Sequence, residues 1–326
     1  MPGMITHYLC GQLCLDKLSD TSMSSVIQRN RQLYNLGTQG PDFFFYYLPA
    51  LWRKRIAGVG GRLHNSRVGQ YFGCLVDEVL GLKDKKEKEA ALAYLAGYLT
   101  HYALDTHAHP YVYYMSGFPT KGDKRPKLQY SIAHRSFETN LDTQLLRMVT
   151  GDKPSQRRLW QLVKVGKSEA GSSAGVISRC LGIVYGIKTD GREVYSAMRS
   201  MARLTRVLQA FGGRRKRILL ALEGLTLQRG RATSMIHDQE VHSDYMNMGA
   251  KPWFYPWEKT SENISTFMEM FDSAIEDAEK FIRGLDALVS NRATRAEFLS
   301  LVGNKSFKSG QDCSKELEFI HHAALS

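Results

Sequence analysis

Two segments of the chain place a histidine and a carboxylate four residues apart, which brings both side chains to one face of a helix. The first pair is His101 and Asp105, and the second is His134 and Glu138, with Asp142 continuing the same stripe. An isolated pair of this kind is usually a surface contact worth a few tenths of a kcal/mol. Two such pairs in one chain instead predict facing ligands on two helices that bind more than one metal ion.

Two further histidines follow the first pair, and the helical angle favours one of them as a third ligand. His109 lies about 80° around an ideal helix from His101, whereas His107 lies about 240° around it and points away. We expect Pro110 to end the helix at His109, which would place this side chain at the mouth of the site. His109 is therefore the predicted ligand, and His107 is the alternative.

Apolar residues three and four positions apart predict the helices that must carry these side chains. The expected helices are residues 24–35, 68–82, 87–108, 129–149, 194–211 and 264–289. Only 9 of the 326 residues are prolines, and runs of alternating β-branched residues are few. The predicted fold class is therefore all-α, a multi-helix bundle with a metal cluster in its core.

The domain organisation follows from the same pattern. We expect one helical domain over residues 1–302, with the metal ligands in residues 1–140 and a helical extension over residues 150–302. The remaining residues, 303–326, are rich in Lys, Ser and Gly at their start, which predicts a loosely attached C-terminal tail.

Composition and charge limit the class of protein and its surroundings. The chain is 43% hydrophobic and 23% charged, which excludes a mainly disordered protein, and its net charge of +12 favours anionic partners. Five cysteines are an odd and sparse set that favours a reducing compartment. We find no signal peptide, and the longest apolar stretch, residues 90–104, is too short to span a membrane. The expected location is cytoplasmic, with peripheral membrane attachment as an alternative.

The order of these residues resembles the zinc-dependent phospholipase C family, whose superfamily includes zinc-dependent single-strand nucleases. The resemblance covers roughly residues 1–140 and is carried by the five ligands named above and by His7 in ITHY, Asp42 in GPDFFFY and His64 in RLHN. It implies an all-α domain that holds three zinc ions. The ligands it implies are Asp42, His64, His101 and Asp105 for the first ion, His109, His134 and Glu138 for the second, and His7 with a bridging Asp105 for the third.

Imidazole nitrogens and carboxylate oxygens are the usual ligands of catalytic zinc. Two zinc ions about 3.5–4 Å apart can lower the pKa of a shared water and stabilise in-line displacement at phosphorus. We therefore expect a phosphodiester hydrolase with two to three zinc ions, in which a zinc-bridging hydroxide attacks. The candidate catalytic residues are Asp105 and Asp42, and Asp42 would alternatively orient or deprotonate the attacking water.

The favoured function is a phospholipase C that releases diacylglycerol and a phosphorylated head group. The expected partners are a phospholipid substrate and a transient membrane surface, with no stable protein partner. One alternative is a zinc-dependent single-strand nuclease, for which nucleic acid would be the substrate. A second is a non-catalytic, zinc-stabilised module that binds anionic membranes.

Several other features have an open interpretation. In the family, the third zinc is also held by the main chain of an N-terminal tryptophan, which this chain lacks; loss of Met1 would leave the amine and carbonyl of Pro2 to take that place. Buried structural thiols are favoured over metal ligands for Cys10 and Cys14. The aromatic segments 43–52 and 253–257 would pack in the core, form a cage for a choline-type cation or contact lipid. The basic segments 121–127 and 212–217 would be solvated or bind anionic partners.

Overall fold

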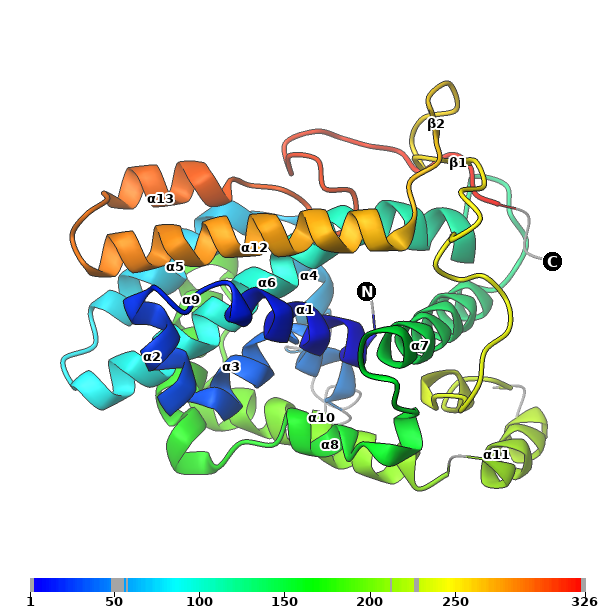
Figure 1. Ribbon diagram of the computed structural model, residues 1–326, viewed down its shortest axis with the longest axis horizontal. Helices are drawn as coiled ribbons and strands as arrows, with labels where there is room; N and C mark the ends of the chain where they lie inside the picture. The colour runs from blue at the N-terminus through cyan, green and yellow to red at the C-terminus, as the bar shows by residue number, and fades with distance from the viewer. Residues whose placement is uncertain (1–2, 48–55, 57, 212, 226–228, 324–326) are drawn as a thin grey trace.

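The computed structural model is a bundle of helices, and the predicted all-α fold class is confirmed (Figure 1). It describes residues 3–47, 56, 58–211, 213–225 and 229–323. The first helices are α1 (Met4–Asp16), α2 (Ser22–Arg29), α3 (Arg31–Gly37), the 3-10 turn η1 (Asp42–Tyr46), α4 (Val59–Asn65), α5 (Val68–Leu80), α6 (Lys85–Ser116) and α7 (Lys127–Thr150).

The second half of the chain is also helical apart from one short hairpin. Its helices are η3 (Pro154–Gln156), α8 (Leu159–Leu162), α9 (Lys167–Tyr185), α10 (Gly191–Gln209), α11 (Arg214–Gly224), η4 (Thr233–Met235), α12 (Phe267–Val289) and α13 (Arg295–Val302). The strands β1 (Trp253–Phe254) and β2 (Glu262–Asn263) pair antiparallel, with Trp253 opposite Asn263. None of the described helices is both long and apolar enough to cross a bilayer.

The centre of the bundle is α6, which carries three of the expected ligands. Its start is capped by Asp84, whose side chain accepts a hydrogen bond from the Glu87 amide at 2.8 Å. From Ala90 to Tyr102 every residue is buried, because α6 packs against α1, α3, α9 and α12 on its different sides (Figure 1). A helix that is apolar all round belongs in a protein interior, which explains the long apolar stretch of the sequence.

Helix α3 approaches α6 closely because each has a glycine at the crossing point. A Cβ on Gly37 would lie 2.2 Å from the carbonyl oxygen of Tyr94, and a Cβ on Gly97 would lie 2.2 Å from that of Tyr34. Only residues without a side chain allow the two backbones to come this near. The close crossing brings the segment after α3, which includes Asp42, next to the middle of α6.

The structure corrects two of the expected helix boundaries. The helix expected over residues 24–35 is two helices, because Asn30 leaves the helical conformation (φ −121°, ψ 37°) and its side chain donates to the Val26 carbonyl. The prediction that Pro110 ends the long helix is wrong, since α6 continues to Ser116. A proline inside a helix costs about 3 kcal/mol, and here the residues that follow it bury apolar side chains, among them Tyr111.

Candidate metal centre

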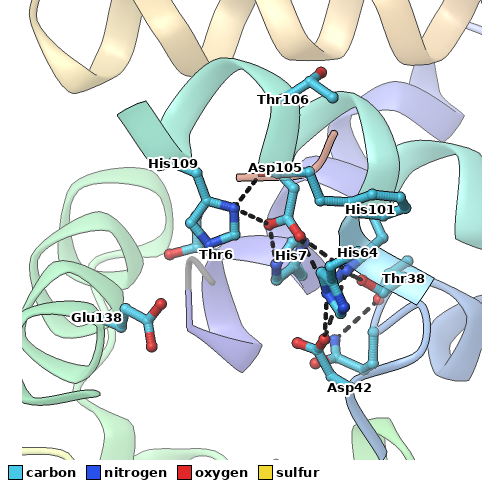
Figure 2. A network of polar contacts seen from close by, with 12 residues as sticks. Thr6, His7, Thr38, Asp42, His64, His101, Asp105, Thr106, His109 and Glu138 are labelled. Carbon is cyan, nitrogen blue, oxygen red and sulfur yellow. Dashed lines mark hydrogen bonds and ion pairs between the residues drawn. The ribbon is translucent and has the colours of Figure 1, made fainter. Parts of the chain in front are cut away.

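Five elements bring the eight predicted ligand residues together around the middle of α6, and all of them except His134 are labelled in Figure 2. They are His7 from α1, Asp42 from η1, His64 from α4, His101, Asp105 and His109 from α6, and His134 and Glu138 from α7. All are buried except the half-buried His134. Their ligand atoms form three groups with spacings of at most 4.8 Å: His7, His101 and Asp105; Asp42, His64 and His101; and His109, His134 and Glu138.

Asp105 lies between four imidazoles (Figure 2). Its Oδ1 atom is 3.3 Å from His7 Nε2 and 3.6 Å from His109 Nδ1. Its Oδ2 atom is 3.1 Å from His101 Nε2 and 3.6 Å from His64 Nε2. This carboxylate therefore faces ligand atoms from α1, α4 and α6 at the same time.

The second carboxylate, Asp42, contacts two of the imidazoles that also contact Asp105. Its Oδ1 atom is 3.2 Å from His64 Nε2 and 3.6 Å from His101 Nε2. The chain just before it must pass close to the His101 ring, and a Cβ on Gly40 would lie 2.2 Å from the ring atom Cδ2. Gly40 also has a φ of +49°, so a glycine is needed here for both space and backbone conformation.

Backbone carbonyl groups hold three of the imidazoles in one orientation. The Nδ1 atom of His64 is 2.6 Å from the Gly60 carbonyl oxygen, and that of His101 is 3.2 Å from the Thr38 oxygen. The Nδ1 atom of His109 is 2.6 Å from the oxygen of Phe307. Donation from Nδ1 leaves the lone pair on Nε2, which is the arrangement that orients a histidine to bind a metal ion.

The third group of ligand atoms lies between α6 and α7. The Nε2 atom of His134 is 2.9 Å from Glu138 Oε1, and its Nδ1 atom is 3.0 Å from the hydroxyl oxygen of Ser116. The ring of His134 stacks against that of His109, with centroids 6.0 Å apart. The i,i+4 pair of α7 thus faces the last histidine of α6, as the sequence pattern predicts.

The chemistry of these atoms fits a divalent metal ion such as zinc. Eight buried atoms of the cluster have no hydrogen-bond partner among the described residues: both ring nitrogens of His7, Nε2 of His64, His101 and His109, Oδ1 of Asp42, and both carboxylate oxygens of Asp105. Each buried polar atom left unpaired costs about 1–3 kcal/mol. A cation bound among nitrogen and oxygen lone pairs removes that cost, and this donor set is one that zinc prefers.

The local electrostatics favour the protonation states that metal binding needs. Burial lowers the pKa of His109 well below its ordinary value and also lowers that of His134, so both imidazoles are neutral. Burial alone would raise the pKa of Asp105, but any positive charge on the facing imidazoles of His109 and His101, together with hydrogen bonds from His101 and His7, holds it well below its ordinary value, so a cation at this place favours the ionised carboxylate. Neutral imidazoles and an ionised carboxylate bind a metal ion without first losing a proton.

The helical spacing predicts that Asp142 continues the ligand stripe, whereas in the structure its carboxylate has other contacts. Its carboxylate accepts hydrogen bonds from the amides of Ile5 and Thr6 at 3.0 and 2.8 Å, from the Thr6 hydroxyl at 2.7 Å, and contacts His237 Nε2 at 2.8 Å. It therefore satisfies the free amides at the start of α1. Through this contact, α7 fixes the helix that carries His7.

The start of the C-terminal segment is buried and not loosely attached. The Phe307 amide donates to the His64 carbonyl at 2.9 Å, and its carbonyl accepts from His109. Its ring is fully buried against those of His64 and His101. The division of the chain after residue 302 stays a prediction, but residues beyond it hold two of the candidate ligands in place.

We expect a chain that ends at residue 302 to lose zinc and stability, because it lacks the partner of His109 and a buried phenylalanine worth about 3–5 kcal/mol. Zinc content and thermal unfolding of the purified protein measure both effects. A chain that ends after Lys315 keeps Phe307 and is the matched control. Equal zinc content in all three proteins would contradict this role of the segment.

His107 faces away from the cluster. Its Nε2 atom lies 2.9 Å from Asp277 Oδ2 on α12, on the side of α6 opposite to the candidate ligands. We therefore expect His109→Ala to lower the zinc content and His107→Ala to leave it unchanged. Elemental analysis of the two purified variants distinguishes them, and loss of zinc from the His107 variant alone would reverse the assignment.

The other open features are mostly structural. Cys10 and Cys14 are buried and belong to none of the three ligand groups, and burial raises the pKa of the Cys10 thiol well above its ordinary value and that of Cys14 to about 12, as for structural thiols. Phe43 is buried in the core, and Trp253 is buried against Tyr111. Pro2 and residues 48–52 lie outside the described residues.

A cavity of about 390 Å³ adjoins the third ligand group. It is lined by Glu138 and by other residues of α7, and Tyr46, which follows Asp42 in η1, forms part of its wall. Most of its surface is apolar, contributed by residues such as Met4, Leu159 and Leu208. A cavity of this size beside a cluster of metal ligands is suited to bind part of a small organic substrate.

An all-α fold that buries histidines and carboxylates in three candidate groups of metal ligands, one of them beside a cavity, is typical of a helical metalloprotein. The family model described as zinc dependent phospholipase C matches residues 6–178, which is more than half of the chain. The protein therefore belongs to the zinc-dependent phospholipase C family, a family of hydrolases. Searches among curated proteins and among solved structures found no match.

Proposed function

We propose that the protein is a zinc-dependent phospholipase C that cleaves the glycerol-side phosphodiester bond of a phospholipid and releases diacylglycerol and a phosphorylated head group. The observation that carries this proposal is that the three ligand groups adjoin one another and that the third group reaches a cavity through Glu138. His101 belongs to two of the groups, and His109, in the third, lies 3.6 Å from Asp105. Family membership supports both the zinc dependence and the class of substrate.

The proposed ligand sets follow these groups. Asp42, His64, His101 and Asp105 would hold one ion, His109, His134 and Glu138 a second, and His7 with Asp105 a third. Bound zinc supplies Lewis acidity at phosphorus and lowers the pKa of water at neutral pH. The catalytic roles proposed for Asp105 and Asp42 are to hold the ions, and Asp42 alternatively accepts the proton of the attacking water.

The protein residues around the cluster contribute by fixing its geometry and excluding bulk water. The three Nδ1 contacts to backbone oxygens keep the Nε2 atoms of His64, His101 and His109 directed inward before substrate arrives. Electrostatic stabilisation of charge that develops during the reaction is larger in such a buried site than in water. The cavity beside Glu138 is where the polar part of the lipid would lie.

The direct test compares zinc-loaded and chelator-treated protein on phosphatidylcholine and phosphatidylinositol 4-phosphate vesicles and on single-stranded DNA. We expect zinc-dependent release of diacylglycerol and a phosphorylated head group from at least one lipid and no cleavage of DNA. Cleavage of DNA without lipid hydrolysis would instead identify a nuclease. If the zinc-loaded protein binds vesicles and cleaves neither substrate, the non-catalytic module is the correct alternative.

A further inference from the structure

The cavity beside Glu138 is lined by one face of α7. Arg135, Glu138, Thr139 and Asp142 all line it, and their spacing of three, four and seven residues places them on the same side of the helix. Arg215, at the start of α11, also lines the cavity. Two guanidinium groups and two carboxylates therefore belong to its wall.

The two carboxylates already have partners. The oxygens of Asp142 accept hydrogen bonds from Ile5 and Thr6 and contact His237. Glu138 contacts His134 and belongs to the third ligand group of the metal centre. Neither carboxylate forms an ion pair with Arg135 or Arg215, although the negative charge of Glu138 lies close enough to stabilise the charged form of Arg135.

The two arginines bind only neutral oxygens. Arg135 donates to the hydroxyls of Ser131 and Ser234 at 2.9 and 3.2 Å, and Arg215 donates to the Ala210 carbonyl at 3.2 Å. Within the part of the chain that the structure describes, no carboxylate oxygen lies within 4.0 Å of either guanidinium group. Both guanidinium groups therefore line the cavity without an ion-pair partner in the part of the chain that the structure describes.

The lining also disfavours a quaternary ammonium group. Such cations are bound by cages of several aromatic rings, and Tyr46 is the one aromatic residue among the described residues of the wall. Guanidinium groups instead bind phosphate and carboxylate oxygens, often with two parallel hydrogen bonds.

We propose that this cavity binds the head group of an anionic phospholipid, and that Arg135 and Arg215 bind an anionic group of the head group other than the scissile phosphodiester. The proposal rests on the phospholipase C activity proposed above and names its substrate class. Arg135 follows His134 directly in α7. The same helix therefore carries both a candidate metal ligand and the proposed specificity residue.

The test measures kcat/KM of the zinc-loaded full chain on mixed micelles of phosphatidylinositol 4-phosphate and of phosphatidylcholine. We expect the wild type to favour the former, and Arg135→Gln to lower kcat/KM for it about tenfold, as for loss of one charge-assisted hydrogen bond. Hydrolysis of phosphatidylcholine by this variant should change much less. Arg147→Gln, on the same helix but outside this cavity, is the matched control.

A preference for phosphatidylcholine, or an equal loss on both lipids, would overturn the proposal. Calorimetric titration with inositol 1,4-bisphosphate and with phosphocholine measures head-group binding independently of the proposed phospholipase activity. If neither lipid is hydrolysed, the phospholipase activity is refuted. If the wild type then binds inositol 1,4-bisphosphate and Arg135→Gln weakens this binding, the assignment of the cavity is still supported. Equal binding of inositol 1,4-bisphosphate and phosphocholine would refute it.

A second observation independently concerns the outer surface of α11. Ile218, Leu222 and Leu225 are 63%, 55% and 83% exposed, although all three are large apolar residues. Their spacing of four and three residues places them in one narrow stripe along the helix. Helix α11 packs mainly against η4 and projects from the rest of the bundle (Figure 1).

The charges beside this stripe are basic. Arg215 and Arg217 are exposed, whereas the carboxylate of Glu223 is turned inward, where it accepts hydrogen bonds from the Gly230 amide and the Thr233 hydroxyl. A second copy of the chain would bring like charges together at such a surface. An apolar stripe flanked by arginines instead complements the acyl boundary and head groups of an anionic bilayer.

We infer that α11 docks the protein on anionic membranes, with Ile218, Leu222 and Leu225 inserted at the acyl boundary. The helix has 11 residues, so it would lie in the plane of the interface and not cross the membrane. Because Arg215 also lines the cavity, docking by α11 would bring the cavity close to the lipid head groups.

The test is co-sedimentation of the zinc-loaded protein with phosphatidylcholine vesicles that contain or lack phosphatidylserine. We expect binding to the anionic vesicles that falls with added salt and that the combined variant Ile218→Ser, Leu222→Ser, Leu225→Ser reduces about tenfold or more. The matched control replaces three exposed apolar residues elsewhere, Ile183, Met248 and Leu301, by serine.

Two results would overturn this inference. The first is unchanged binding of the α11 variant to anionic vesicles. The second is a wild-type dimer in sedimentation velocity that the α11 variant converts to a monomer, because the stripe would then be covered by a second copy of the chain. Neither measurement depends on hydrolysis, so the outcome is separate from that of the proposed function.

Discussion

Replacing Asp105 by asparagine is expected to lower phosphodiester hydrolysis by at least about a thousandfold, because several kcal/mol of transition-state stabilisation depend on the metal ions. Asp105 lies 3.1–3.6 Å from nitrogens of His7, His64, His101 and His109. The variant loses the negative charge that faces all four imidazoles. Zinc per chain, measured by elemental analysis, should fall together with the activity.

The control for this variant is Asp277→Asn. Asp277 contacts His107 on the outer side of α6 and belongs to none of the three ligand groups. We expect it to keep the zinc content and the activity of the wild type. Full zinc content and full activity in Asp105→Asn would show that the shared carboxylate does not hold the ions.

Replacing Asp142 by alanine is expected to lower the free energy of unfolding by about 3–5 kcal/mol, as for the loss of one partner of a buried charged network. The variant leaves the amides of Ile5 and Thr6 and the Thr6 hydroxyl without their acceptor inside the protein. It also leaves His237 without its carboxylate. Denaturant unfolding of the zinc-loaded protein measures the change.

A matched control for stability is Glu240→Ala, which removes an exposed carboxylate that pairs with Lys153 at the surface. Exposed ion pairs contribute little to stability, so this variant should unfold near the wild-type denaturant concentration. If Asp142→Ala unfolds at the same concentration as this control, the start of α1 does not depend on the contact with α7.

Local spacing was sufficient to predict part of the site. The pairs His101 with Asp105 and His134 with Glu138 face their neighbours as predicted, because residues four apart on a helix share a face whatever surrounds them. The all-α fold was predictable because apolar residues three and four positions apart indicate helices. By contrast, His7, Asp42 and His64 carry no spacing signal, and they were placed through the family resemblance alone.

The contacts that fix the ligands could not be predicted from the sequence. Backbone carbonyls of Thr38, Gly60 and Phe307 orient three imidazoles, and every residue has such a carbonyl, so none of these residues carries a distinguishing signal. Asp142 fitted the ligand stripe by spacing, and only its contact with α1, which is remote in sequence, shows its other role.

The two helix boundaries that were predicted wrongly have different causes. The apolar periodicity of residues 24–35 predicts one continuous helix, but the Asn30 side chain bonds the Val26 carbonyl and the helix breaks there. The break expected at Pro110 rests on the local preference of proline. Burial of the residues after Pro110 in the core outweighs the lost hydrogen bond, so tertiary packing decides where α6 ends.

Anomalous diffraction at the zinc edge from crystals of the zinc-loaded protein tests the central claim most directly. We predict two or three peaks among the eight candidate side chains, within about 2.0–2.2 Å of Nε2 of His64, His101 and His109 and of an oxygen of Asp105. Zinc found only at surface residues or thiols, with none among these side chains, would contradict the account.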